Sequence, residues 1–196
     1  MKKYTFIITL IISLVLISCS RESVEQDIYF EIDEDLLGEV YQDSVLSIGM
    51  RVPADWNDLT AQFQDSAREQ FELDSDYWGL GLSLRKIFAN TTQNISFLLF
   101  EFDHTQLDDD EDIAINIFLD RISEDSETLM HGEYQHNKIS FIQVAYRVND
   151  MINLKILGET RDDSLFVIDF FIPGELYMDF LATLESTIGS IHPLSV

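Results

Sequence analysis

Cysteine, basic residues and long apolar runs are scarce in this chain of 196 residues. Cys19 is the only cysteine, so no internal disulfide can form. Lys and Arg total 12 against 36 Asp and Glu, a formal net charge of −24, and a surface of that sign repels nucleic acid. The longest apolar run covers about 14 residues, whereas a membrane-spanning helix needs roughly 20. The sequence therefore excludes an internal disulfide scaffold, argues against nucleic-acid binding and offers no apolar run long enough for a comfortable membrane-spanning helix.

That apolar run, residues 4–17, is what the sequence offers first. Lys2 and Lys3 precede it, which is typical of a cleaved secretory leader. The run ends in Leu-Ile-Ser-Cys at 16–19, and these four residues resemble the lipobox of bacterial lipoproteins. The resemblance implies cleavage after Ser18 and a lipid on Cys19, which also accounts for the lone thiol.

The lipobox resemblance sets the expected organisation and location. We predict a lipoprotein signal peptide at 1–18, a lipidated tether at 19–27 and a single domain at 28–196. The lipid attaches the protein to a membrane of the bacterial cell envelope, and Ser20 resembles the default signal for the outer membrane. The leader carries two lysines and no acid, so its removal changes the net charge from −24 to −26.

Apolar periodicity predicts the elements of that domain. Alternating or continuous apolar runs predict strands at 28–32, 45–52, 80–89, 95–102, 138–148, 151–159 and 165–172. Helical spacing predicts helices from about 57 to 71, from 113 to 122 and from 175 to 191. Consecutive strands with short turns pair antiparallel. The sequence therefore predicts an α+β fold, one antiparallel sheet of five to seven strands with helices packed on its faces. The strand at 165–172 is apolar on both faces, so we expect it at the centre of the sheet.

A family resemblance supports a similar fold. Residues 46–56 read Leu-Ser-Ile-Gly-Met-Arg-Val-Pro-Ala-Asp-Trp, which looks like the first strand of PsbP/Mog1/DcrB-like domains, ending in Pro-x-x-Trp. The three-strand meander and a last helix ending in Ser190-Ile191 are similar to the family's closing elements. The resemblance spans about residues 40–193. It implies an α/β/α sandwich, roles in binding and assembly, and no shared catalytic residues.

Few residues stand out as a binding site. Trp56 either covers one end of the core or contacts a ligand. Together with Tyr77 and Trp78 it marks a possible binding patch, apolar and flanked by acids. Neither a Gly-x-Ser-x-Gly motif nor a glycine-rich phosphate loop is present. We therefore expect no catalytic residue and no cofactor.

Metal sites are not expected either. The acidic run at 108–112 lacks the spacing and central glycine of a calcium loop, and acids there would offset the dipole of a following helix. Of the histidines His104, His131, His136 and His192, the middle pair is separated by Gly132, which we interpret as a loop. Asp169 lies in an apolar strand and, if buried, needs a partner such as Arg147 or Lys155.

Three functions fit these features. The first is a lipid-anchored, non-enzymatic binding or assembly module with a protein partner in the envelope. The second is a carrier or sensor of a small ligand or cation. The third is a hydrolase whose site is assembled only by the fold.

Overall fold

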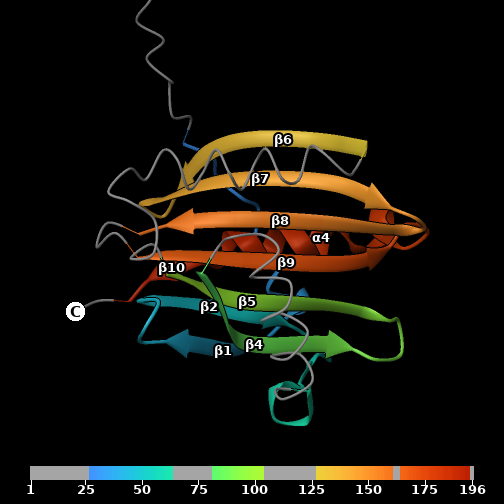
Figure 1. Cartoon of the computed structure of the whole chain (residues 1–196), viewed down its shortest axis with the longest axis horizontal. Coiled ribbons are helices and arrows are strands. Elements are labelled where there is room, and N and C mark those ends of the chain that lie inside the picture. Colours follow the sequence, from blue (N-terminus) through green and yellow to red (C-terminus); the bar gives the residue numbers. More distant parts are fainter. Residues whose placement is uncertain (1–26, 64–80, 104–126, 161–163, 195–196) are drawn as a thin grey trace, which may run out of the picture.

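The larger part of the fold is a seven-stranded antiparallel sheet. The computed structural model describes residues 27–63, 81–103, 127–160 and 164–194. The sheet has the order β3-β4-β5-β9-β8-β7-β6, and Figure 1 shows its long strands running across the molecule. Its strands are β3 (Asn57–Asp58), β4 (Gly81–Asn90), β5 (Ile95–Asp103), β6 (Glu127–His136), β7 (Ile139–Val148), β8 (Met151–Glu159) and β9 (Leu165–Pro173).

Strand β9 occupies the middle of this sheet, between β5 and β8. Its first six residues are all buried. A central strand is covered on both faces, because each face packs against its own apolar layer. The prediction of a central strand at 165–172 is confirmed. Hairpins β4–β5 and β7–β8 also form where short polar turns were expected.

A second, three-stranded antiparallel sheet lies against the first. It has the order β1-β2-β10 and consists of β1 (Leu37–Asp43), β2 (Ile48–Pro53) and β10 (His192–Pro193). The short 3-10 helix η2 (Glu34–Leu36) precedes it, and helix α4 (Tyr177–Gly189) precedes β10. Figure 1 shows α4 behind β8 and β9. Apolar residues of β2, the larger sheet and α4 form one core cluster, which includes Met50, Phe97, Phe170 and Leu184.

The predicted fold class, with helices packed on the faces of one sheet, is wrong. The described residues are mostly strand and form two antiparallel sheets, and α4 is the one α-helix that lies wholly within them. The α/β/α sandwich is wrong for the same reason. A second sheet supplies the apolar surface that several helices were expected to supply.

Three local predictions also fail. Residues 28–32 form no strand, and Ile28 makes a single backbone hydrogen bond, from its N–H to the carbonyl of Gln135 (2.9 Å). Residues 44–47 are a turn, because the Asp43 carboxylate accepts the N–H groups of Val45 and Leu46 and Ser47 has a φ of 53°. Residues 127–136, interpreted partly as a loop, form β6.

Other predicted elements lie only partly within the described residues. A helical turn begins at Thr60, whose N–H is capped by Asp58 Oδ1 (2.9 Å). The rest of that predicted helix, the acidic run at 108–112 and the predicted helix at 113–122 lie outside the described residues. In the part of the chain that the structure describes, no helix is long and apolar enough to span a membrane.

Candidate functional site

A cavity of about 350 Å³ opens where the two sheets and α4 meet. Its walls come from η2, the turn after β2, the β4–β5 turn and the first half of α4. They are formed by Asp35, Leu36, Ala54, Asp55, Trp56, Asn90, Gln93, Ile95, Leu176, Asp179, Phe180 and Thr183. The volume lies at the small end of the range for ligand pockets.

Trp56 is the aromatic wall of this cavity. Pro53 ends β2, and the chain then turns through Asp55, which has a φ of 64°. The indole stacks on Phe180 of α4, with ring centroids 5.6 Å apart and planes at 16°. It also lies 5.6 Å from the ring of Phe97 in the core. Trp56 therefore covers one end of the core, and its half-buried side chain also lines the cavity. That it contacts a ligand stays a prediction.

The cavity is strongly acidic. Asp35, Asp55 and Asp179 are all exposed, and the described residues that line the cavity include no Lys, Arg or His. The N-terminus of α4 opposes them with only about half a positive charge. Three carboxylates outweigh that charge, so the cavity favours a cation.

One rim of the cavity is held by its own turn. Asn90 Oδ1 accepts the N–H groups of Thr92 (3.1 Å) and Gln93 (3.2 Å), and its Nδ2 donates to Gln93 Oε1 (3.2 Å). Such a side-chain turn fixes the hairpin loop without longer-range contacts. The amide groups of this rim add neutral polar atoms to the acidic wall.

Of the predicted site residues, the structure places Trp56 in the cavity. Tyr77, Trp78, Ser18 and Cys19 lie outside the described residues, so the patch and the lipidation site stay predictions. Sequence reasoning missed Asp35 and Asp179, which are far from Trp56 along the chain. The adjacent Asp55 was the one signal of an acidic surface beside the indole.

The described histidines are spread over the fold. His131 is exposed on β6 near Glu133 (3.7 Å), His136 is buried at the end of the same strand, and His192 lies on β10. His104 lies outside the described residues. Within the described ranges, no group of three or more His, Cys, Asp or Glu side chains could hold a metal ion.

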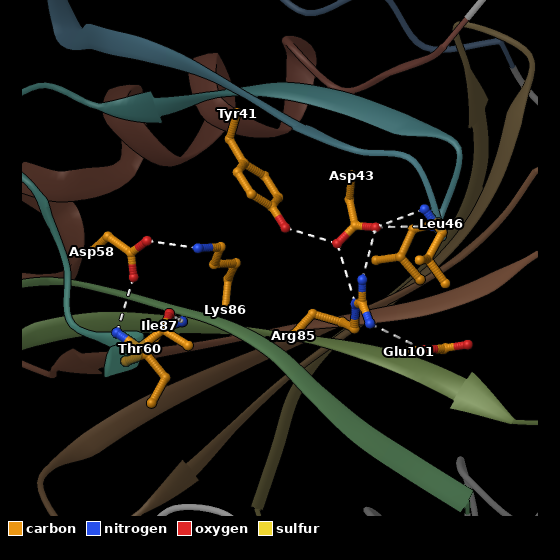
Figure 2. A network of polar contacts seen from close by, with 10 residues as sticks. Tyr41, Asp43, Leu46, Asp58, Thr60, Arg85, Lys86, Ile87 and Glu101 are labelled. Atoms are coloured by element: carbon orange, nitrogen blue, oxygen red, sulfur yellow. Dashed lines mark hydrogen bonds and ion pairs between the residues drawn. The ribbon is translucent and has the colours of Figure 1, made fainter. Parts of the chain in front are cut away.

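A polar network ties the small sheet to the large one (Figure 2). A β-bulge at Leu84/Lys86 turns both Arg85 and Lys86 of β4 toward β1. Arg85 donates to both oxygens of Asp43 (3.2 and 3.3 Å) and also pairs with Glu101 (3.6 Å). Lys86 donates to Asp58 (2.7 Å), so two cations of β4 hold two acids from β1 and β3.

Asp43 is the centre of this network. Its side chain is buried, and burial alone would raise the pKa of the carboxyl. Hydrogen bonds from Tyr41 (2.7 Å), Arg85 and the N–H groups of Leu46 and Val45 outweigh burial and hold that pKa below its ordinary value. The network is therefore a charged structural joint between the sheets.

The predicted partner of Asp169 is confirmed as Lys155. The two residues face each other on β9 and β8, and their ammonium and carboxylate form a buried ion pair. Burial raises the pKa of the Asp169 carboxyl, although Lys155 opposes this effect. Arg147, the other candidate, is exposed near the end of β7.

Comparison with known proteins supports the fold. No protein-family model matches the chain, and no curated protein matches it. Among solved structures, the solution structure of cyanobacterial PsbP (CyanoP) from Synechocystis sp. PCC 6803 is similar to this chain. The TM-score is 0.51 and the sequence identity is 14%, over 81% of this chain and 93% of the cyanobacterial chain. The chain thus has a PsbP-like fold, as the sequence resemblance predicted.

Proposed function

We propose that this protein is a lipid-anchored, non-enzymatic binding module of the bacterial cell envelope, expected in the outer membrane. Its partner is a protein that presents a cationic side chain to the cavity beside Trp56. The lipobox resemblance at 16–19 supports the anchor, and the cavity supports the binding role.

The acidic cavity is the observation on which the binding role depends. Three carboxylates and an indole line a space large enough for the end of a lysine or arginine side chain. A protein with a large excess of acidic residues also attracts cationic partners over longer distances, which raises their rate of association. A small organic cation would meet the same walls, and the experiment below includes it.

The test uses a lysine and its neutral counterpart as probes. The full chain in detergent is titrated with the capped tripeptide acetyl-Ala-Lys-Ala-amide and with the same peptide carrying acetylated lysine. The indole N–H resonance of Trp56, assigned with Trp56→Phe, reports occupancy. We expect a saturable shift with the lysine peptide and none with the acetylated one.

Variants of α4 locate the site. Asp179→Asn removes a cavity carboxylate and should weaken binding about fivefold, the order of one exposed ion pair. Glu185→Gln is the matched control, since Glu185 is exposed on the same helix but does not line the cavity. Equal binding of both peptides, or equal affinity of both variants, would contradict the proposal. Tighter binding of free methylammonium than of the lysine peptide would support a small-cation carrier instead.

A further inference from the structure

The segment between the proposed tether and β1 is fastened to the body at both ends. At one end the Ile28 N–H donates to the carbonyl of Gln135 on β6, and at the other the Asp33 N–H donates to Ser186 Oγ of α4 (3.0 Å). Between them the Phe30 ring packs edge-on against His136, with centroids 4.9 Å apart. This segment, residues 28–33, is called the N-terminal strap below.

Gly189 makes room for the strap. A Cβ atom at this position would lie 2.5 Å from Phe30 Cβ and 3.2 Å from Ile32 Cγ1. The strap therefore rests directly on the last residue of α4, where a side chain would displace it.

His136 connects the strap to the end of α4. Its Nδ1 lies 2.9 Å from the carbonyl oxygen of Ile28, and its Nε2 lies 2.8 Å from the carbonyl oxygen of Gly189. A carbonyl oxygen can only accept, and a neutral imidazole has only one N–H to donate. Both contacts are hydrogen bonds at once only when the ring is an imidazolium.

Two features of the surroundings act on the charge of the ring in opposite directions. Gly189 ends α4, and the carbonyls at a helix C-terminus favour a cation. Asn137 Nδ2, which donates to the Ile191 carbonyl (2.8 Å), also lies 2.9 Å from His136 Nε2. In the neutral ring Nε2 accepts from Asn137 and leaves the Gly189 oxygen facing a lone pair.

Other ionisable groups around the ring do not fix its charge. The ionisable residues nearest to the contacts of His136 along the chain lie on the strap and the residue before it, on β6, in the β6–β7 turn, on α4 and on β10. They are Asp27, Tyr29, Glu31, Asp33, Tyr134, Lys138, Glu185 and His192. Among the described residues none of them forms an ion pair with His136. Burial raises the pKa of Tyr134, which keeps that phenol neutral.

We propose that His136 is a pH-operated latch for the N-terminal strap. The imidazolium bridges the Ile28 carbonyl of the strap to the Gly189 carbonyl of α4, and loss of the proton removes the bond to Gly189. The strap then loses this connection to α4 and is held less tightly. Histidine is the side chain that changes charge between about pH 5 and 8. Release of these six residues lengthens the reach of a lipid tether by about 20 Å. This consequence rests on the proposed anchor, whereas the latch itself does not.

Hydrogen exchange of the Ile28 amide tests the latch in the full chain. After correction for intrinsic exchange, protection should fall about tenfold between pH 5.5 and pH 8, as expected for loss of one charge-assisted hydrogen bond. The Gly174 amide, bonded to the Asp150 carbonyl, serves as the reference and should not change. The readout needs no lipid, so failure of the anchor and failure of the latch are distinguishable.

A pair of histidine variants on one strand completes the test. His136→Gln should abolish the pH dependence, while His131→Gln, at an exposed position of β6, should keep it. Nitrogen NMR of the wild-type ring, which needs no variant, should show both His136 nitrogens protonated at pH 5.5 and one at pH 8. An unchanged Ile28 amide, a pH dependence that survives His136→Gln, or a ring neutral at both pH values would overturn the latch.

Discussion

Single residues stabilise the junction between the two sheets through a backbone irregularity. The bulge in β4 sends two consecutive side chains, Arg85 and Lys86, to the same face, which an ideal strand cannot do. Arg85 thereby reaches Asp43. The Asp43 carboxylate also accepts hydrogen bonds from backbone N–H groups of the turn that joins β1 to β2. One carboxylate thus connects the local turn to the neighbouring sheet.

Removing the charge of Asp43 should destabilise the protein. We expect Asp43→Asn to lower the free energy of unfolding by roughly 2 kcal/mol at pH 7, less than for a fully buried pair because Arg85 is partly exposed. Urea unfolding curves measure this difference. Glu39→Gln, at an exposed position of the same strand, is the control and should change little.

The stability difference between wild type and Asp43→Asn should depend on pH. The folded protein lowers the pKa of Asp43, so the stabilisation is present above the ordinary carboxyl pKa of about 3.9 and is lost as the pH falls through the lower folded value. The stability gap between wild type and Asp43→Asn should therefore close below about pH 4. A gap that stayed constant down to pH 2.5 would show that the charge of Asp43 is not what stabilises the junction.

Among the elements, the pairing of β8 with β9 depends on a glycine. Gly158 faces Phe166 across the two strands, and a Cβ at Gly158 would lie 2.2 Å from Phe166 Cζ. Phe166 is fully buried and belongs to the core cluster that also contains Phe97 and Phe170. Its ring therefore occupies the space above Gly158 and cannot move aside without disturbing the core.

A methyl group at this position should be costly. We expect Gly158→Ala to destabilise the fold by about 3 kcal/mol, the upper range for overpacking, measured by thermal or urea unfolding. Gly132→Ala on β6 is the matched control, because nothing lies within 4 Å of its added Cβ. Adding Phe166→Leu to Gly158→Ala should restore part of the lost unfolding free energy. No such restoration would show that the Phe166 ring is not the group that the added methyl strains.

For the whole molecule, the open point is whether a lipid attaches this PsbP-like domain to a membrane. The proposal of a lipid anchor depends on residues 16–19, which lie outside the described residues. The proposed tether would confine the cavity to the neighbourhood of the membrane. The proposed location therefore limits which partners could reach the cavity, and the anchor needs its own test.

Loss of the thiol should abolish anchoring. In bacteria expressing the full chain, Cys19→Ser should leave the precursor uncleaved and without labelled palmitate, because the lipid bonds to sulfur. Ser20→Ala, next to the predicted acceptor, is the control and should be lipidated normally. Labelled palmitate entering Cys19→Ser would argue against the anchor.

The sequence predicts those strands whose own residues show an apolar run or an apolar alternation bounded by polar turns. β9 is apolar on both faces, and the β4–β5 and β7–β8 hairpins have polar turns between apolar runs. Lys155 could be named as a partner of Asp169 because a buried carboxylate needs a cation on a neighbouring strand. β1 was missed because its middle residues are mostly exposed, and β6 because an edge strand can carry His131 and Glu133 in water.

The sequence by itself determined the central strand, the main hairpins, the last helix and the acidic surface, since each follows from contiguous residues and their burial. Tertiary structure decided the second sheet, the cavity and the His136 contacts. Asp35, Asn90 and Asp179 meet at one cavity although they are far apart in the chain. No local periodicity encodes such a meeting, because it arises only when distant apolar faces are buried against each other.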